Sequence, residues 1–220
     1  MVRKSIAWLI PTVAIAVFGT NVRAQAQTTK NFEIEYNTLT QISPFQTGYV
    51  RATITGTSTT PGAFGLDSFV SNTYGRIEDT GNPSLLRYTF NSDPTAIGLP
   101  STLESFSDRY FGGPNELFGK ANDSAEINLA AGTIQGGGTI TIFNGTGVFE
   151  NATGQITFSQ QDRLGPPDVP AVGVAILKFE IQTPTRQVPE YTPTYTLVSA
   201  GLIGAVLFKR RKRQKANNLL

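Results

Sequence analysis

The chain has 220 residues, of which 39% are hydrophobic and 15% charged, and it contains neither cysteine nor histidine. Without these two residue types, disulfide bonds, thiolate nucleophiles, Cys/His zinc sites and mechanisms that need a histidine base are excluded. The formal net charge of +2 is unevenly distributed along the chain. Residues 25–190 contain nine basic residues and all sixteen acidic residues, so the charge of this region is −7. An acidic central region repels phosphate backbones, so we expect no nucleic-acid partner.

The N-terminus has the three parts of a secretory signal peptide. Basic residues precede an apolar run, and a small-x-small sequence follows it: Arg3 and Lys4, residues 6–18, and Ala24-Gln25-Ala26. The apolar run is shorter than the roughly 20 residues that cross a bilayer, which favours a cleaved signal over an uncleaved anchor. We therefore expect residues 1–26 to be removed by cleavage before Gln27, or alternatively before Gln25.

Residues 27–183 are expected to form one all-β domain outside the cytoplasm. Thr, Gly, Ser, Asn and Phe are frequent there, and the spacing of apolar residues that is typical of helices is nearly missing. Apolar and polar residues alternate in short runs, as in half-buried strands. The candidate strands are residues 32–36, 50–54, 86–90, 126–130, 139–143, 154–159 and 171–183. About seven to nine such strands predict a single antiparallel β-barrel or sandwich.

Three local features of this domain are predicted in more detail. In the last candidate strand the apolar positions change parity, so we expect a β-bulge between Ile176 and Leu177. A short helix is expected from Ser101, where Ser-Thr-Leu-Glu has the spacing of a capping box. Turns are expected where Gly, Pro and Asn cluster, with Asn144-Gly145 as the best hairpin turn. The turn segments are residues 60–62, 80–83, 112–115, 136–138 and 144–145.

The C-terminus has a tripartite arrangement that is typical of an address or an anchor. A Pro/Thr linker over residues 184–193 contains Val188-Pro189-Glu190 and precedes a transmembrane helix expected over residues 194–208. A basic cytoplasmic tail over residues 209–220 follows, and its first residues should stop transfer and fix the topology. These residues are Lys209, Arg210, Arg211, Lys212 and Arg213. The apolar run from Tyr195 to Phe208 measures only about 21 Å as a helix, against a hydrocarbon core of about 30 Å, so it suits a transient span better than a permanent one.

This tail resembles the sorting segment of bacterial PEP-CTERM proteins. Val188-Pro189-Glu190 stands where that family has Val-Pro-Glu-Pro, although Tyr191 replaces the second proline. The resemblance covers about the last 30 residues. It implies recognition by a membrane-embedded exosortase, cleavage near Pro189-Glu190, and delivery to the cell surface or extracellular matrix of a Gram-negative-type bacterium. An association with exopolysaccharide is implied as well.

A second, shorter resemblance lies in the central domain. Residues 145–154 are similar to the Gly-Thr-Gly-x-Phe-x-x-Ala-x-Gly hairpin of allene oxide cyclase-like and dirigent-like β-barrels. The glycines would permit a tight turn, and Phe149 and Ala152 would point inward. That family's barrels hold apolar ligands, but no catalytic residue of the family has a counterpart in this chain.

Other candidate sites are weaker. Asn122-Asp123-Ser124-Ala125-Glu126 could surround Ca²⁺ with oxygens, but it lacks the regular Asp-x-Asp-x-Asp-Gly loop, so we expect an ordinary turn. Glu104 and Asp108 would be i, i+4 on the short helix, a pair that is usually a solvated face rather than a glycosidase site. We therefore expect no catalytic residue, metal or cofactor, and a non-enzymatic structural or interaction role. The alternative is a tethered or released barrel that binds a small apolar ligand or a saccharide.

Overall fold

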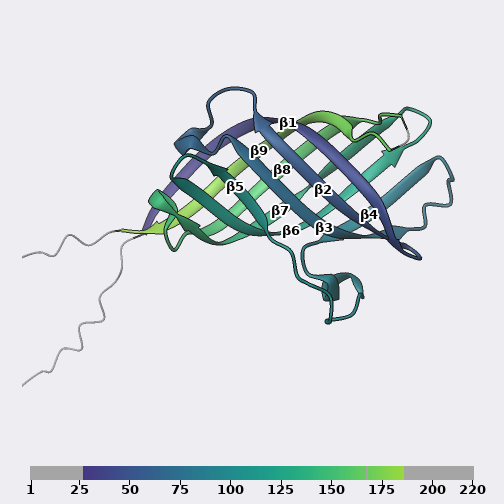
Figure 1. The fold of residues 1–220 in the computed structure, drawn as a ribbon, viewed down its shortest axis with the longest axis horizontal. Coiled ribbons are helices and arrows are strands. Elements are labelled where there is room, and N and C mark those ends of the chain that lie inside the picture. Colours follow the sequence, from purple (N-terminus) through teal and green to yellow (C-terminus); the bar gives the residue numbers. More distant parts are fainter. Residues whose placement is uncertain (1–26, 167, 186–220) are drawn as a thin grey trace, which may run out of the picture. The chain divides into compact units, whose positions relative to one another are not determined.

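The structure, a computed structural model, describes residues 27–166 and 168–185, and within them every regular element is a strand or a short 3-10 helix (Figure 1). The predicted signal peptide, the sorting motif Val188-Pro189-Glu190, the apolar run and the basic tail lie outside these residues. Among the residues that are described, no helix is long and apolar enough to cross a membrane. The predicted all-β class is confirmed.

Nine antiparallel strands form a single sheet. They are β1 (Gln27–Gln46), β2 (Tyr49–Ser58), β3 (Ser68–Glu78), β4 (Leu85–Asn91), β5 (Asp108–Gly112), β6 (Asn115–Asn128), β7 (Thr133–Thr146), β8 (Thr153–Arg163) and β9 (Ala171–Pro184). Three 3-10 turns join some of them, namely η1 (Ala63–Gly65), η2 (Pro94–Ile97) and η3 (Gly147–Phe149). The hydrogen-bonded order is β2-β1-β9-β8-β7-β6-β4-β3-β5, and β2 also pairs with β3. This last pairing closes the sheet into a barrel (Figure 1).

One position of the barrel wall is shared by two short strands. Both β4 and β5 lie between β3 and β6 and pair antiparallel with each of them, at different heights. Residues 92–107, which connect β4 to β5, leave the wall and form the protrusion below the barrel in Figure 1. Dividing the wall position in this way lets the chain add an external segment without opening the barrel.

The segment 92–107 is held to the outside of the barrel by aromatic side chains. Tyr74 is fully buried, stacks on Phe106 with ring centroids 4.7 Å apart, and donates a hydrogen bond from its hydroxyl to the Glu104 carbonyl at 3.1 Å. The Arg51 guanidinium lies 4.4 Å from the centroid of the Phe45 ring and 5.3 Å from that of Tyr74. Stacking and cation–π contacts of this kind stabilise an external cluster that has no access to the main core.

The helix predicted from Ser101 is wrong. One turn forms there, in which the Leu103 amide donates to the Pro100 carbonyl at 3.2 Å, but no α-helix occurs among the described residues. A single turn does not repay the cost of nucleating a helix. Leu103 and Phe106 instead pack against the external aromatic cluster, and Tyr110 lies in β5 and points into the barrel.

The β-bulge predicted between Ile176 and Leu177 is also wrong. Strand β9 keeps one register against both β1 and β8 over its whole length. Its inward residues are Ala171, Gly173, Ala175, Leu177, Phe179, Ile181 and Thr183, so the sequence alternation starts with small residues and not with the valines. Val172 and Val174 face outward and are 53% and 38% exposed. Because apolar residues also lie on the outer face of this barrel, they do not by themselves identify the buried positions of β9.

The turns were predicted with mixed success. Turns at residues 60–62, 80–83 and 112–115 are confirmed, because each separates two successive strands. The turns predicted at residues 136–138 and 144–145 are wrong, since both segments lie within β7. The chain reverses after Thr146 instead, through η3, and a register shift between β6 and β7 at Phe118/Gly119 accommodates the irregular end of β7.

Candidate functional site: a polar belt inside the barrel

The barrel interior has a polar belt between two apolar clusters. One cluster surrounds Phe149 and Phe179, and the other surrounds Phe90 and Ile134. Along β1, for example, the inward residues pass from Tyr36 in the first cluster through two threonines to Ile42 beside the second. The inward polar residues between the clusters, here called the interior belt, are Thr38, Thr40, Ser71, Thr73, Asp108, Asp123, Gln160 and Asp162.

Each aspartate of the interior belt lies opposite a glycine on the neighbouring strand. The cross-strand partners are Asp108 and Gly119, Asp123 and Gly138, and Asp162 and Gly173. A Cβ atom on Gly138 would lie 2.4 Å from the Asp123 Cβ, and one on Gly173 would lie 2.2 Å from an Asp162 carboxylate oxygen. The glycines therefore leave the space that these two carboxyl groups occupy, which is a recognised use of glycine inside a strand.

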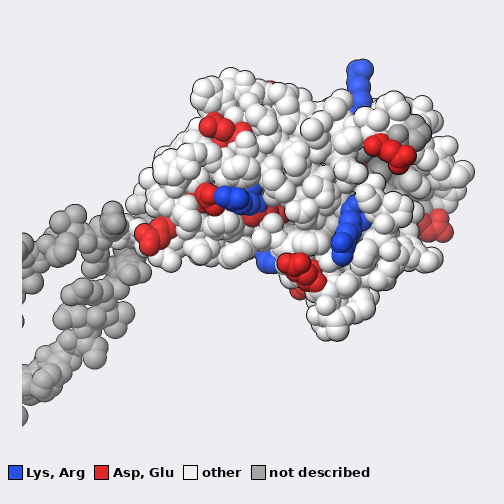
Figure 2. All heavy atoms as spheres, viewed as in Figure 1, with Lys and Arg blue, Asp and Glu red and all other residues white. Residues whose placement is uncertain are grey.

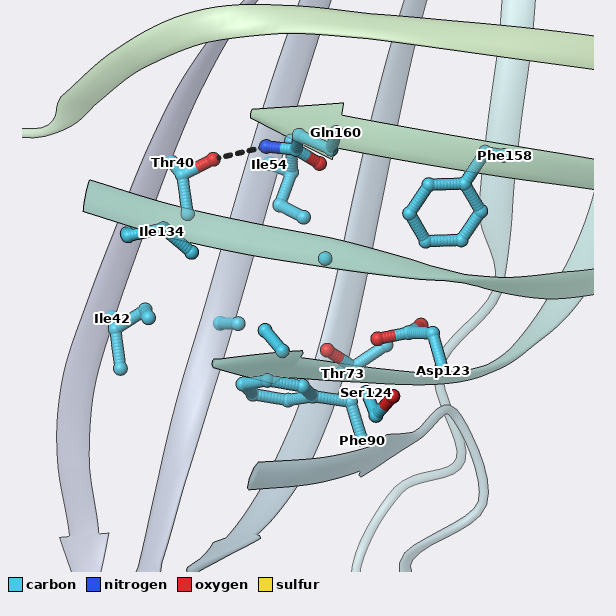
Figure 3. Close-up of a pocket in the computed structure, with 13 residues that line it drawn as sticks. Thr40, Ile42, Ile54, Thr73, Phe90, Asp123, Ser124, Ile134, Phe158 and Gln160 are labelled. Carbon is cyan, nitrogen blue, oxygen red and sulfur yellow. Dashed lines mark hydrogen bonds between the residues drawn. The ribbon is translucent and has the colours of Figure 1, made fainter. Parts of the chain in front are cut away.

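Asp162 belongs to a fully hydrogen-bonded group. Its two carboxylate oxygens accept from the Thr38 hydroxyl at 2.8 Å and from the Gln160 amide nitrogen at 2.7 Å. The same Gln160 nitrogen also donates to the Thr40 hydroxyl at 2.8 Å, as Figure 3 shows. These bonds join β1 to β8 over the strand β9 that lies between them, and they satisfy groups that would otherwise be costly to bury.

Asp108 and Asp123 are placed differently. Asp108 is 1% exposed and accepts hydrogen bonds from the Ser71 hydroxyl at 2.8 Å and the Tyr110 hydroxyl at 3.4 Å. Asp123 is partly buried and borders two internal cavities, and no described residue donates a hydrogen bond to its carboxyl group. In Figure 3 its carboxyl group points into the space between Thr73 and Phe158.

Both of these carboxyl groups have strongly perturbed acidity. The pKa of Asp108 is raised to about 7, mainly by burial; the hydrogen bond from Ser71 opposes the increase, and the negative charge of Asp123 adds to it. Burial alone raises the pKa of Asp123 to about 7. The physical cause is the loss of hydration, which penalises the charged form of a carboxyl group. At neutral pH the two groups are therefore partly protonated.

The two cavities beside Asp123 are small. They have volumes of about 30 and 20 Å³, and Ile54, Phe158 and Gln160 border both of them. A cavity needs about 10–15 Å³ to hold one water molecule, so each has room for one or two waters. The inward Gly136 lines the larger cavity and has no side chain to fill it. The arrangement offers oxygen ligands and protons rather than room for an organic substrate.

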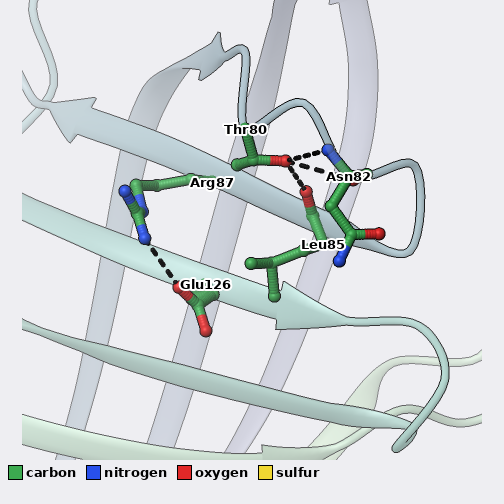
Figure 4. Close-up of polar contacts among 5 residues, drawn as sticks. All are labelled: Thr80, Asn82, Leu85, Arg87 and Glu126. Carbon is green, nitrogen blue, oxygen red and sulfur yellow. Dashed lines mark hydrogen bonds and ion pairs between the residues drawn. The ribbon is translucent and has the colours of Figure 1, made fainter.

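A larger hollow of about 610 Å³ lies outside the barrel, in the loop between β3 and β4. Only residues 77–86 border it. Figure 4 shows why the loop holds its shape, because the Thr80 hydroxyl donates to the Leu85 carbonyl at 2.6 Å and accepts from the Asn82 amide at 3.2 Å. A hollow formed by a single hairpin without converging polar groups from other strands does not make a persuasive binding site.

The outer surface carries scattered charges. On the face shown in Figure 2, basic and acidic side chains are scattered among neutral residues, and some of opposite charge touch. The ion pair between Arg87 and Glu126, 3.0 Å long and drawn in Figure 4, joins two exposed side chains and contributes little to stability. No basic side chain among residues 27–166 and 168–185 is buried, so no described cation neutralises the interior belt by direct contact.

The residues singled out in the described sequence are not brought together as predicted. Glu104 lies in the external segment 92–107 and Asp108 in the interior, so the proposed carboxylate pair does not form. Residues 122–126 belong to β6 and not to a turn, and Asp123 points inward from them. In the Gly145–Gly154 segment, Phe149 and Ala152 are both fully buried, which confirms their predicted direction.

Sequence reasoning missed the interior belt, although a signal for it exists. Glycines within strands, such as Gly119, Gly138 and Gly173, indicate positions where another group lies close to the backbone of the sheet.

Comparisons of the chain with models of protein families, with curated proteins and with solved structures found no match.

Proposed function

We propose that this is an exported bacterial protein that an exosortase-type membrane enzyme cleaves at Val188-Pro189-Glu190 and releases to the cell surface or extracellular matrix. The observation that carries the proposal is the order of the tail, in which this motif is followed by an apolar run and then by the cluster 209–213. The positive cluster would keep the C-terminus in the cytoplasm and the barrel outside it. A signal peptide over residues 1–26 supplies the export.

The barrel's topology supports this arrangement. Gln27, the first residue of β1, is paired with Pro184, the last residue of β9. The predicted signal peptide and the sorting tail therefore join the barrel at one end, and the sheet closes using only residues between them. Cutting the chain near Pro189 would leave every strand and every ladder hydrogen bond of residues 27–184 in place.

The proposed role of the released domain is structural or interactive and not enzymatic, in a matrix that contains exopolysaccharide. The filled interior supports it over the alternative of a small apolar or saccharide ligand held inside the barrel. Cavities of about 30 and 20 Å³ are far below the roughly 300–1,000 Å³ of typical ligand sites. Binding a small apolar molecule or a saccharide in the interior would require the barrel wall to open, whereas contacts on the outer face would not.

Intact mass spectrometry of the native protein, recovered separately from membranes and from the matrix, tests the proposal. We expect a matrix form that starts near Gln25 or Gln27 and ends near Pro189. The variant in which Pro189 and Glu190 are both replaced by alanine should accumulate uncut in the membrane.

The matched control replaces the two preceding residues, Arg186 and Gln187, by alanine, and it should be processed normally. Normal release of the Pro189/Glu190 variant, or a single membrane form that retains Leu220, would contradict the proposal.

A further inference from the structure

The interior belt holds more negative charge than the barrel neutralises. The titratable side chains that face this space are three aspartates and two tyrosines, namely Asp108, Asp123, Asp162, Tyr36 and Tyr110. Lys120, whose charge lowers the pKa of Asp108, donates its hydrogen bonds to Ser105 and Phe106 in the external segment 92–107. When both Asp108 and Asp123 ionise, their charges have no cation in contact, which is strongly unfavourable in a protein interior.

The smaller cavity collects oxygen atoms around these charges. Asp108 and Asp123 border it together with three other polar residues, Ser71, Tyr110 and Gln160. Asp108 is already oriented by Ser71 and Tyr110, whereas the Asp123 carboxyl group has no partner among the described residues. The rest of the lining is apolar and includes Ile54, Phe158 and Leu177, so it offers the carboxyl group no other polar partner. A positively charged ligand beside these polar side chains would supply one.

The size and charge of the cavity restrict the ligand. Its volume of about 20 Å³ admits one particle of the size of water and excludes organic ammonium ions. Within the described residues no group of three or more acidic side chains could hold a metal ion. Ca²⁺ takes six to eight oxygen ligands and favours several carboxylates, so a divalent ion suits this cavity poorly.

We propose that the smaller cavity of the interior belt binds one small monovalent cation, Na⁺, K⁺ or NH₄⁺, between Asp108 and Asp123. The carboxylate oxygens supply the charge, and the hydroxyl of Ser71 and the amide oxygen of Gln160 supply neutral ligands. The cation replaces a proton on this pair, and the displaced proton passes to the solvent. Binding is therefore coupled to pH, being strong above pH 7 and absent at pH 5, where the pair keeps its protons.

Thermal unfolding of the full mature chain in a non-ionic detergent, followed by circular dichroism, tests this proposal. The chlorides of Na⁺, K⁺ and NH₄⁺ are compared with choline chloride at equal ionic strength, because choline is too large for the cavity. At pH 8.5 we expect at least one small cation to raise Tm by several degrees, with saturation, relative to choline. At pH 5 the small cations and choline should have the same effect.

Two variants and a control locate the site. Asp123→Asn should abolish the difference between the small cations and choline, and Ser71→Ala should shift the saturation midpoint severalfold to higher concentration. Glu126→Gln, which removes a carboxylate from the exposed ion pair with Arg87, should keep the response. Equal effects of all the small cations and choline at pH 8.5, or a full response in Asp123→Asn, would overturn the proposal. Processing of the tail is measured separately and does not depend on this result.

Discussion

Replacing Asp123 by asparagine should stabilise the barrel at neutral and alkaline pH. The substitution keeps the shape of the side chain and removes a charge that no described residue neutralises. The pKa of Asp123 is raised from 3.8 to about 7 in the folded protein. Its contribution to stability is therefore fully present below pH 3.8 and is lost as the pH rises through 7.

The size of the effect follows from the shift. A difference of roughly three pH units between the folded and unfolded pKa corresponds to about 4 kcal/mol at 1.36 kcal/mol per unit. This is an upper limit, because Asp123 borders cavities in which water lowers the cost of ionisation. The gain should increase further through Asp108, since removing the charge of Asp123 lowers the pKa of that neighbour. At pH 4 the variant and the wild type should be nearly equal in stability.

Urea unfolding of both proteins between pH 4 and pH 8.5 would measure this difference in choline buffer, so that small cations do not contribute. Tyrosine fluorescence is a suitable signal, because the single tryptophan, Trp8, lies in the predicted signal peptide and Tyr36, Tyr74 and Tyr110 are buried. Asp162→Asn is the control, because the Asp162 carboxylate accepts hydrogen bonds from Thr38 and Gln160. Disturbing these bonds should lower the free energy of unfolding by about 1–3 kcal/mol. If Asp123→Asn gains no stability over the wild type at pH 8.5, the account of an uncompensated interior charge is wrong.

Two further predictions concern packing. Gly138→Ala should lower the free energy of unfolding by about 1–3 kcal/mol, because the added Cβ would lie 2.4 Å from the Cβ of Asp123. Gly136→Ala is the control on the same inward face. Its added Cβ meets only ordinary contacts beyond 3.4 Å, so it should cost clearly less in the same urea experiment. Tyr74→Ala should cost about 3–5 kcal/mol and increase amide hydrogen exchange throughout residues 92–107. Tyr74→Phe, which loses the hydroxyl's bond to the Glu104 carbonyl and the long bond from Arg51, should cost about 1–2 kcal/mol. Unchanged exchange in Tyr74→Ala would show that this cluster does not hold the segment.

Alternation was sufficient to predict the fold class but not the facing of each strand. The strands around residues 32–36 and 86–90 were found because apolar residues mark the inward face on β1 and β4. On β9 the same rule failed, since Val172 and Val174 face solvent while Gly173 and Ala175 face the interior. Period-two patterns report the buried face only where the interior is apolar, and here part of it is polar.

The interior belt was beyond prediction for a related reason. The sequence placed Asp123 in an ordinary turn or, less favoured, around Ca²⁺, and not in an interior, because carboxyl groups are rarely buried without a partner. Its direction depends on the pairing of β6 with β7, which sets Gly138 opposite it, and such long-range pairing cannot be derived from one local window of sequence. The short strand β5 was missed because its position depends on the segment 92–107 that precedes it.

The interior belt lies far from the ends of the barrel strands where the proposed processing would take place, so its protonation should not depend on that processing. Thr38, the first residue of the belt on β1, follows Gln27 by eleven residues of continuous strand, which corresponds to roughly 35 Å along the chain. The proposed cleavage near Pro189 would act beyond the end of β9 that pairs with Gln27. No described contact of Asp108 or Asp123 involves the last residues of β9, so processing should leave the charge and hydration of the belt unchanged. The same proton and cation chemistry would then accompany the barrel in both its anchored and its released form.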